Sequence, residues 1–145
     1  MSTPENLDMD DVVHPQSWTL ALMLHGPRGN RSRFLLTMMV LSTWMEDYEG
    51  EILPAAPTLQ KWAECTRLSM RTIRQHIRIA EREGWLIVDS RCDPPQYRCS
   101  LPPRLAGRKF HMRLYHERRL PNGRIIEIEP AIVSRPSLSR GATNG

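Results

Sequence analysis

Cysteines, long apolar runs and a targeting segment are scarce or missing in this sequence. Its 145 residues include only three cysteines, an odd number that cannot form a fully paired disulfide framework. The longest apolar run, residues 34–41, is interrupted by a threonine and falls well short of the ~20 residues that cross a bilayer. No signal peptide is recognisable. We therefore expect a cytoplasmic protein with reduced thiols and no membrane partner, in which a disulfide between Cys92 and Cys99 is disfavoured.

The motifs of common enzymes and metal sites are also missing. The sequence has no glycine-rich phosphate loop, no His-Glu-x-x-His zinc motif and no Gly-x-Ser-x-Gly elbow. His111 and His116 are five residues apart, not the four that place two ligands on one helical face, and Cys92 and Cys99 have no second cysteine pair. We expect no enzymatic activity, no bound metal and no cofactor.

Lysine is nearly absent. Lys61 and Lys109 are the only two lysines, and arginine supplies the remaining positive charge. The formal net charge of +4 is unevenly distributed: residues 1–66 carry −5, residues 67–124 carry +9 and residues 125–145 are neutral. A GC-rich genome explains the choice of arginine over lysine, but it does not explain this clustering. The basic half therefore predicts a polyanionic partner, and nucleic acid is the first candidate.

Two amphipathic helices joined by a tight turn are predicted within residues 58–83. Ser69 stands where the second helix needs an N-cap, and Gly84 stands where that helix should end. The apolar residues of each helix share one face: Leu59, Trp62 and Ala63 in the first, and Leu68, Ile73, Ile77 and Ala80 around the second. We expect the core to contain Trp44, Trp62 and Trp85, and we expect His76 to be a packed or partly exposed histidine and not a ligand.

The outward face of the second helix carries the candidate DNA-binding residues. Arginine can bind guanine bidentately and glutamine can bind adenine in the same way, whereas an apolar side chain can contact the thymine methyl group. Residues at the start of such a helix can also reach phosphates. The alternative is that this face is only solvated and that Ser69 only caps the helix. The candidates are Ser69, Met70, Arg71, Thr72, Arg74, Gln75 and Arg78.

A β-hairpin is predicted directly after this helix. Residues 85–88 and 96–101 read as two strands, and Asp93-Pro94-Pro95 marks the turn between them. Arg91 and Arg98 flank the tip, where they could enter a minor groove or bind the DNA backbone. The alternative is an exposed hairpin that uses its charge to remain soluble.

These features together resemble the winged helix-turn-helix domains of phage, plasmid and bacterial regulators and of phage replication proteins. Residues 34–44 look like the first helix of such domains, and residues 47–54 look like the acidic link that follows. Arg67 replaces the glycine usual in the turn, and residues 60–62 depart from the usual pattern. The resemblance covers roughly residues 31–102 and implies a mainly α fold with a small β-hairpin. The matching segments are Pro54 or Pro57, Thr58-Leu59, Leu68-Ser69, Thr72-Ile73 and Gly84-Trp85-Leu86.

The expected organisation has four parts. Residues 1–16 form a flexible acidic arm, and residues 17–102 form the winged helix-turn-helix domain, with helices at 17–25, where Ser17 is the cap, and at 33–45. Residues 103–129 form a basic extension, in which Leu105, Phe110 and Leu114 could share a helical face before a short strand. This extension either packs on protein or contacts DNA. Residues 130–145 form a disordered tail.

The leading functional hypothesis is a sequence-specific double-stranded DNA-binding protein that regulates transcription. Small proteins of this kind bind as homodimers to half-sites about one helical turn apart. The N-terminal helix or the basic C-terminal helix would form the dimer. One alternative is a replication initiation factor of a phage or plasmid, which the resemblance supports equally well. Another is a winged-helix protein–protein interaction module, which the outward arginines disfavour because interface cores are depleted in charge.

Overall fold

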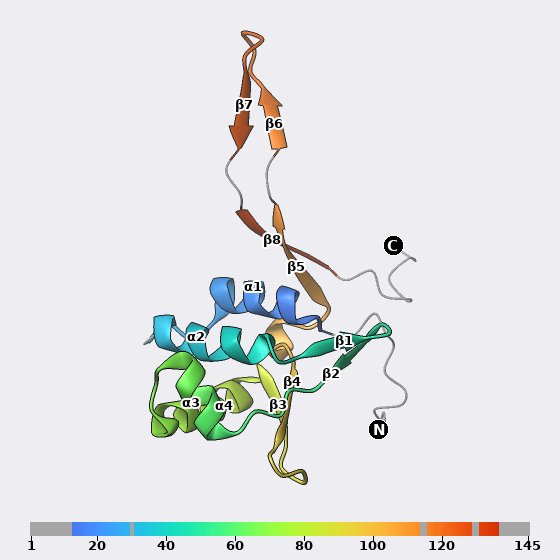
Figure 1. Ribbon diagram of the computed structural model, residues 1–145. Helices are drawn as coiled ribbons and strands as arrows, with labels where there is room; N and C mark the ends of the chain where they lie inside the picture. The colour runs from blue at the N-terminus through green and yellow to red at the C-terminus, as the bar shows by residue number, and fades with distance from the viewer. Residues whose placement is uncertain (1–12, 30, 114–115, 129–130, 137–145) are drawn as a thin grey trace.

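The computed structural model describes residues 13–29, 31–113, 116–128 and 131–136. Within them the chain is mixed α/β, with four α-helices and four two-stranded antiparallel sheets (Figure 1). The helices are α1 (Pro15–His25), α2 (Arg31–Ser42), α3 (Leu59–Thr66) and α4 (Met70–Glu83). The paired strands are β1 (Glu46–Tyr48) with β2 (Glu51–Leu53), β3 (Leu86–Asp89) with β4 (Gln96–Cys99), β5 (Arg108–Arg113) with β8 (Ala131–Pro136), and β6 (His116–Arg119) with β7 (Ile125–Ile128).

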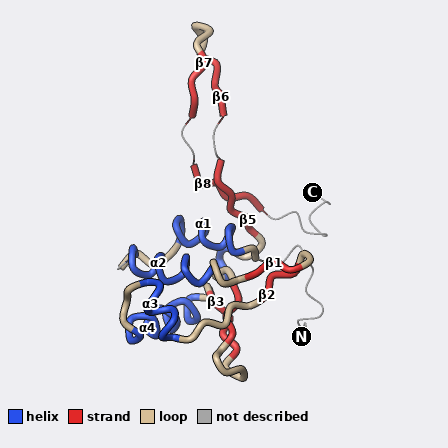
Figure 2. The backbone as a smooth tube through the Cα atoms, viewed as in Figure 1, coloured by secondary structure: helices blue, strands red, loops and turns tan. Residues whose placement is uncertain are grey.

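The helices group together, and the strand pairs project from them (Figure 2). β5 and β8 lie beside α1, whereas the β3–β4 hairpin extends from the end of α4. The expected fold class, mainly α with one small hairpin, is therefore wrong in its proportions. Three further strand pairs are present in the described residues: β1–β2, β5–β8 and β6–β7.

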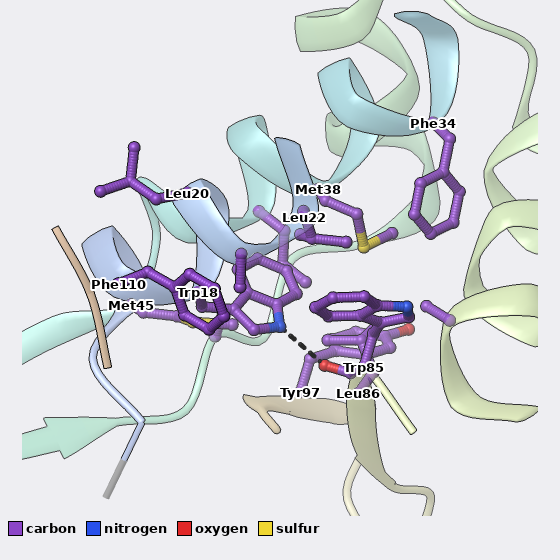
Figure 3. Packing of buried hydrophobic residues seen from close by; sticks show 14 of the residues in the cluster. Trp18, Leu20, Leu22, Phe34, Met38, Met45, Trp85, Leu86, Tyr97 and Phe110 are labelled. Carbon is purple, nitrogen blue, oxygen red and sulfur yellow. Dashed lines mark hydrogen bonds between the residues drawn. The ribbon is translucent and has the colours of Figure 1, made fainter. Parts of the chain in front are cut away.

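A single buried cluster joins all four helices to β3, β4 and β5. Trp18 of α1, Trp62 of α3 and Trp85 after α4 are completely buried, and half-buried Trp44 packs edge-on against Trp62. The Trp18 indole Nε1 donates a hydrogen bond of 2.8 Å to the carbonyl of Trp85, which ties α1 to the strand that follows α4 (Figure 3). Of the tryptophans predicted for the core, Trp62 and Trp85 are confirmed there, whereas Trp44 packs against the edge of the cluster and is only partly buried. The other large buried side chains include Phe34, Met38, Leu41, Ile73 and Tyr97.

Thr37 of α2 fixes the positions of both α3 and α4. Its carbonyl accepts a hydrogen bond of 3.0 Å from Trp62 Nε1, and its hydroxyl lies 2.7 Å from Nδ1 of the buried His76. The same hydroxyl lies 3.1 Å from the carbonyl of Arg33, one turn earlier in α2. Burial, and secondarily the charge of Arg33, lower the pKa of His76. The expectation of a packed histidine is confirmed.

The local signals around α3 and α4 are borne out by the backbone. Thr58 caps α3 by accepting from the amide of Lys61, and Ser69 caps α4 by accepting from the amide of Thr72. Arg67, in the turn, adopts the left-handed conformation with φ of 59°, where glycine is usual. Gly84 ends α4 with φ of 91°, and an added Cβ would come within 3.1 Å of the Pro102 backbone. A side chain at this position would therefore meet both strain and a clash.

The acidic link before α3 forms a hairpin of its own. β1 and β2 pair in the register Tyr48↔Glu51, and Glu49 and Gly50 make the turn with φ of 51° and 83°. After it, Ala55 forms an isolated bridge with Tyr97 of β4. The segment between α2 and α3 therefore adds one residue pair to the edge of the β3–β4 sheet.

The structure corrects the C-terminal predictions. The described residues of the basic extension form no α-helix. After a short 3-10 helix, η3 (Pro103–Leu105), they form β5 and β6. Leu105 and Phe110 are both buried, but Phe110 reaches the core from β5, where its ring packs edge-on against His25 of α1. The expected short strand is β7, and the expected tail contains β8, which pairs with β5 in the register Phe110↔Ser134. Leu114 and residues 137–145 lie outside the described residues.

The N-terminal predictions also need correction. Residues 1–12 of the expected arm lie outside the described residues, but the last two residues of that arm belong to α1, which begins at Pro15. Its N-cap is His14, not Ser17. The Ser17 hydroxyl instead accepts a hydrogen bond of 2.8 Å from the amide of Phe110, which joins α1 to β5. α2 begins two residues earlier and ends three residues earlier than expected.

Candidate nucleic-acid interface

The predicted recognition residues form one exposed stripe on α4. Arg71, Arg74, Gln75 and Arg78 follow the i, i+3, i+4, i+7 spacing of a helical face, and all four are exposed. Ile73, His76 and Ala80 form the opposite, buried face of the same helix. The amphipathic pattern therefore divides α4 as the sequence predicted, and it brings these four candidate residues together.

The first turn of α4 carries the other three candidates. Ser69 accepts from the Thr72 amide at 3.1 Å and donates to the Thr72 hydroxyl at 2.9 Å. This geometry confirms the predicted capping role of Ser69. Met70 is exposed over 44% of its surface, so its apolar side chain is accessible to a partner. Thr72 is half-buried, and a contact of either hydroxyl with phosphate remains a hypothesis.

The arginines of α4 have no carboxylate partner among the described side chains. The ion pair found in the described ranges joins Arg91 to Asp89, on the β3–β4 hairpin. The acidic residues of α4 itself, Glu81 and Glu83, lie in its last turn, at the opposite end from Arg71 and Arg74. The first two turns of this helix therefore present positive charge that no acidic residue of the same helix offsets.

Unlike the arginines of α4, Arg91 on the β3–β4 hairpin has a carboxylate partner. The Asp89 carboxylate accepts two hydrogen bonds of 2.9 Å from the Arg91 guanidinium and a third of 3.0 Å from the Arg91 amide. These bonds lower the pKa of Asp89 to about 2. Smaller influences are burial, which raises this pKa, and the charges of Arg91 and Arg98, which lower it. This pair was not predicted from the sequence, although an aspartate two residues before a loop arginine is a recognisable turn signal.

Arg98 is exposed on β4, opposite Ile87 of β3, and it lies away from the hairpin turn. The hairpin also contains Asp89 and Asp93, so its two arginines are matched by two aspartates. Among the described side chains, no ion pair or hydrogen bond links Arg91 or Arg98 to the α4 stripe. Cys92 and Cys99 are free thiols, as expected.

Two further features of the described residues bear on the site. No group of three or more His, Cys, Asp or Glu side chains there could hold a metal ion. Among the described helices, none combines the length and apolarity needed to cross a membrane.

The comparisons with known proteins identify no relative. No protein-family model, curated protein or solved structure matches this chain.

Proposed function

We propose that this chain is a sequence-specific double-stranded DNA-binding protein in which α4 enters the major groove. The observation that carries the proposal is the division of α4 into a buried face and an exposed stripe of Arg71, Arg74, Gln75 and Arg78. A major groove is wide enough for one α-helix, and its base edges offer acceptors to arginine and both partners to glutamine. The exposed Met70 would supply the apolar contact to thymine.

The stability of α4 supports this role. A recognition helix must hold its side chains in a fixed orientation, since base readout depends on bidentate geometry. The Ser69 cap, the Gly84 terminus and the buried contact of His76 with Thr37 fix both ends and the middle of α4. The exposed arginines then need to order only their own side chains on binding.

A winged helix-turn-helix architecture is part of the same proposal. The chain order of α2, the Ala55 bridge, α3, α4 and the β3–β4 hairpin supports it, as does the tight turn through Arg67. The hairpin would then lie against the DNA backbone as the wing. Because its arginines are matched by aspartates, we assign the specificity to α4 and only a minor share of the affinity to the hairpin.

The biological role that fits best is transcriptional regulation by a homodimer, since dimers of helix-turn-helix proteins read half-sites one helical turn apart. The α1 side chains Trp18, Ala21 and Leu22 are already used in the core, so a dimer would use other surfaces of the chain. The two-stranded β6–β7 pair is one such surface, because it lies away from the helical body (Figure 1).

The test is a selection of binding sites from random duplex DNA, repeated with Arg71→Ala and with the matched control Arg82→Ala in the last turn of α4. We expect a defined motif that Arg71→Ala blurs at one base pair and that Arg82→Ala leaves intact. A palindromic motif would identify the dimer. Weak and steeply salt-dependent binding without any motif would contradict the proposal, because it would mean that the arginines bind phosphates only.

A further inference from the structure

A cleft of about 590 Å³ opens on the side of the molecule where α1, β2, the β3–β4 hairpin and the β5–β8 pair meet. This volume is within the range of small-molecule binding sites, roughly 300–1,000 Å³. The α4 stripe takes no part in the cleft, since no residue of α4 lines it. The cleft is therefore separate from the proposed major-groove surface.

The charges around the cleft are all of one sign. Its lining includes Arg98, Arg108, Lys109 and Arg135, together with two histidines, and it contains neither aspartate nor glutamate. Lys109 and Arg135 are direct cross-strand partners of the β5–β8 pair. Like charges directly opposite each other destabilise a strand pair. Among the described side chains, no carboxylate pairs with either of them.

The interior of the cleft is apolar. Met45 and Phe110 form buried parts of the wall, and Ile87 is exposed over 56% of its surface, a large value for an isoleucine. Cys99 also lines the cleft, and its thiol lies 3.0 Å from the sulfur of Met45. Burial raises the pKa of this thiol, so it remains neutral and adds no negative charge beneath the cations.

We propose that this cleft binds an anionic amphiphile, a small molecule with one acidic headgroup and an apolar body. The headgroup would lie between Lys109 and Arg135 and relieve their repulsion, and the apolar body would cover the exposed side chain of Ile87. A free phosphate or a DNA backbone satisfies only the first half of this description, because neither has an apolar part. A site that combines an apolar wall with a few convergent charges is the usual arrangement for ligands of this kind.

Decanoate is a suitable probe, and decyltrimethylammonium is its control of opposite charge with the same chain length. We expect calorimetry to show one decanoate per chain and much weaker binding of the cation. Inorganic phosphate should bind weakly as well. Equal binding of decanoate and the cation, binding of phosphate as tight as that of decanoate, or no binding of decanoate would each overturn the proposal.

The two lysines of the chain give a matched pair of variants. Lys109→Glu should weaken decanoate binding by roughly tenfold or more, because it places a like charge beside the headgroup. Lys61→Glu, the same change on the exposed surface of α3, should leave it unchanged. Lys109→Glu should not unfold the protein, because a glutamate opposite Arg135 is a favourable cross-strand pair and should raise Tm. Equal affinities of the two variants would overturn the proposal.

A second readout needs no variant. Acetylation with a lysine-reactive reagent, followed by mass spectrometry, reports Lys61 and Lys109 separately in the unmodified protein. Saturating decanoate should slow the acetylation of Lys109 at least severalfold and leave the rate at Lys61 unchanged. Equal rates at Lys109 with and without decanoate would contradict the proposed location.

Discussion

The α4 helix and the β3–β4 hairpin both contain exposed arginines, but the two regions hold them in different ways. On α4, Arg71 and Arg74 stand on a capped helix, with no carboxylate near them among the described side chains. On the hairpin, the guanidinium of Arg91 is bound by both oxygens of Asp89. An arginine that already has a bidentate partner must break that pair before it can bind a phosphate or a base.

The comparison shows that the count of basic residues is a poor measure of an interface. The hairpin and the first turns of α4 look equally basic when the arginines alone are noted. The neighbouring residues decide which arginines can bind a phosphate or a base. The first turns of α4 contain no acidic residue, so their arginines are free to bind, whereas an Asp two residues before an Arg in a turn pairs with that Arg. Four changes test whether this difference between the regions is real.

The largest difference should appear when the same substitution is made at Ile73 of α4 and at Ile87 of β3. Ile73 is completely buried, so Ile73→Ala should lower the free energy of unfolding by about 2–5 kcal/mol through lost burial and a cavity. Ile87 is 56% exposed, and Ile87→Ala should cost less than about 1 kcal/mol. Urea denaturation of both variants measures the difference, and similar losses would show that α4 is not the better anchored element.

Removal of the α4 cap should have the next largest effect. Ser69→Ala deprives the Thr72 amide of its acceptor and should lower stability by about 1 kcal/mol. Ser90→Ala, at an exposed position in the hairpin turn, is the matched control and should stay within about 0.5 kcal/mol of the unmodified protein. A cap that contributes nothing would remove one reason for the fixed orientation of the recognition side chains.

A smaller effect is expected from pH, and it should come from α4 rather than from the hairpin. The folded protein lowers the pKa of His76, so the unfolded chain binds the proton first, and stability should fall as the pH drops below about 6.5. The Asp89 pKa of about 2 means that the contribution of its ion pair is present above the usual carboxyl pKa and is lost only as the pH approaches 2. His76→Gln should flatten the dependence between pH 8 and 5; an unchanged slope would assign it to another group.

The smallest effect should come from the release of Arg91. Asp89→Asn removes the charge that holds this arginine, so binding of random duplex DNA at low salt should become tighter by about threefold. Asp93→Asn removes one negative charge from the same hairpin without freeing Arg91, and it should have a weaker effect. Equal gains for the two variants would mean that only net charge matters in this region.

Local rules were sufficient to predict the centre of the molecule from its sequence. Ser69, Gly84 and the spacing of Ile73, Ile77 and Ala80 act within a few residues of one another, and the bounds of α4 agree with them. The burial of Trp62 and Trp85 also follows, because side chains of that size on an apolar face have few other places to lie.

The remainder depended on contacts between distant segments. Phe110 and Leu105 fit a helical face as well as a strand, and the pairing of β5 with β8, which decides between these choices, has no local signal. The Thr37–His76 bond joins residues that are 39 positions apart. The Asp89–Arg91 pair was within reach of sequence reasoning, but it required attention to the neighbours of each arginine and not only to its charge.

The most direct test of the central claim compares Arg74→Ala with Arg91→Ala on two duplexes, one with the selected motif and one with the same bases scrambled. Fluorescence anisotropy at several salt concentrations gives each Kd. We predict that Arg74→Ala loses about 1–3 kcal/mol on the motif and little on the scrambled duplex, whereas Arg91→Ala changes neither by more than about 0.5 kcal/mol. Equal losses for both variants on both duplexes would contradict the assignment of base readout to α4.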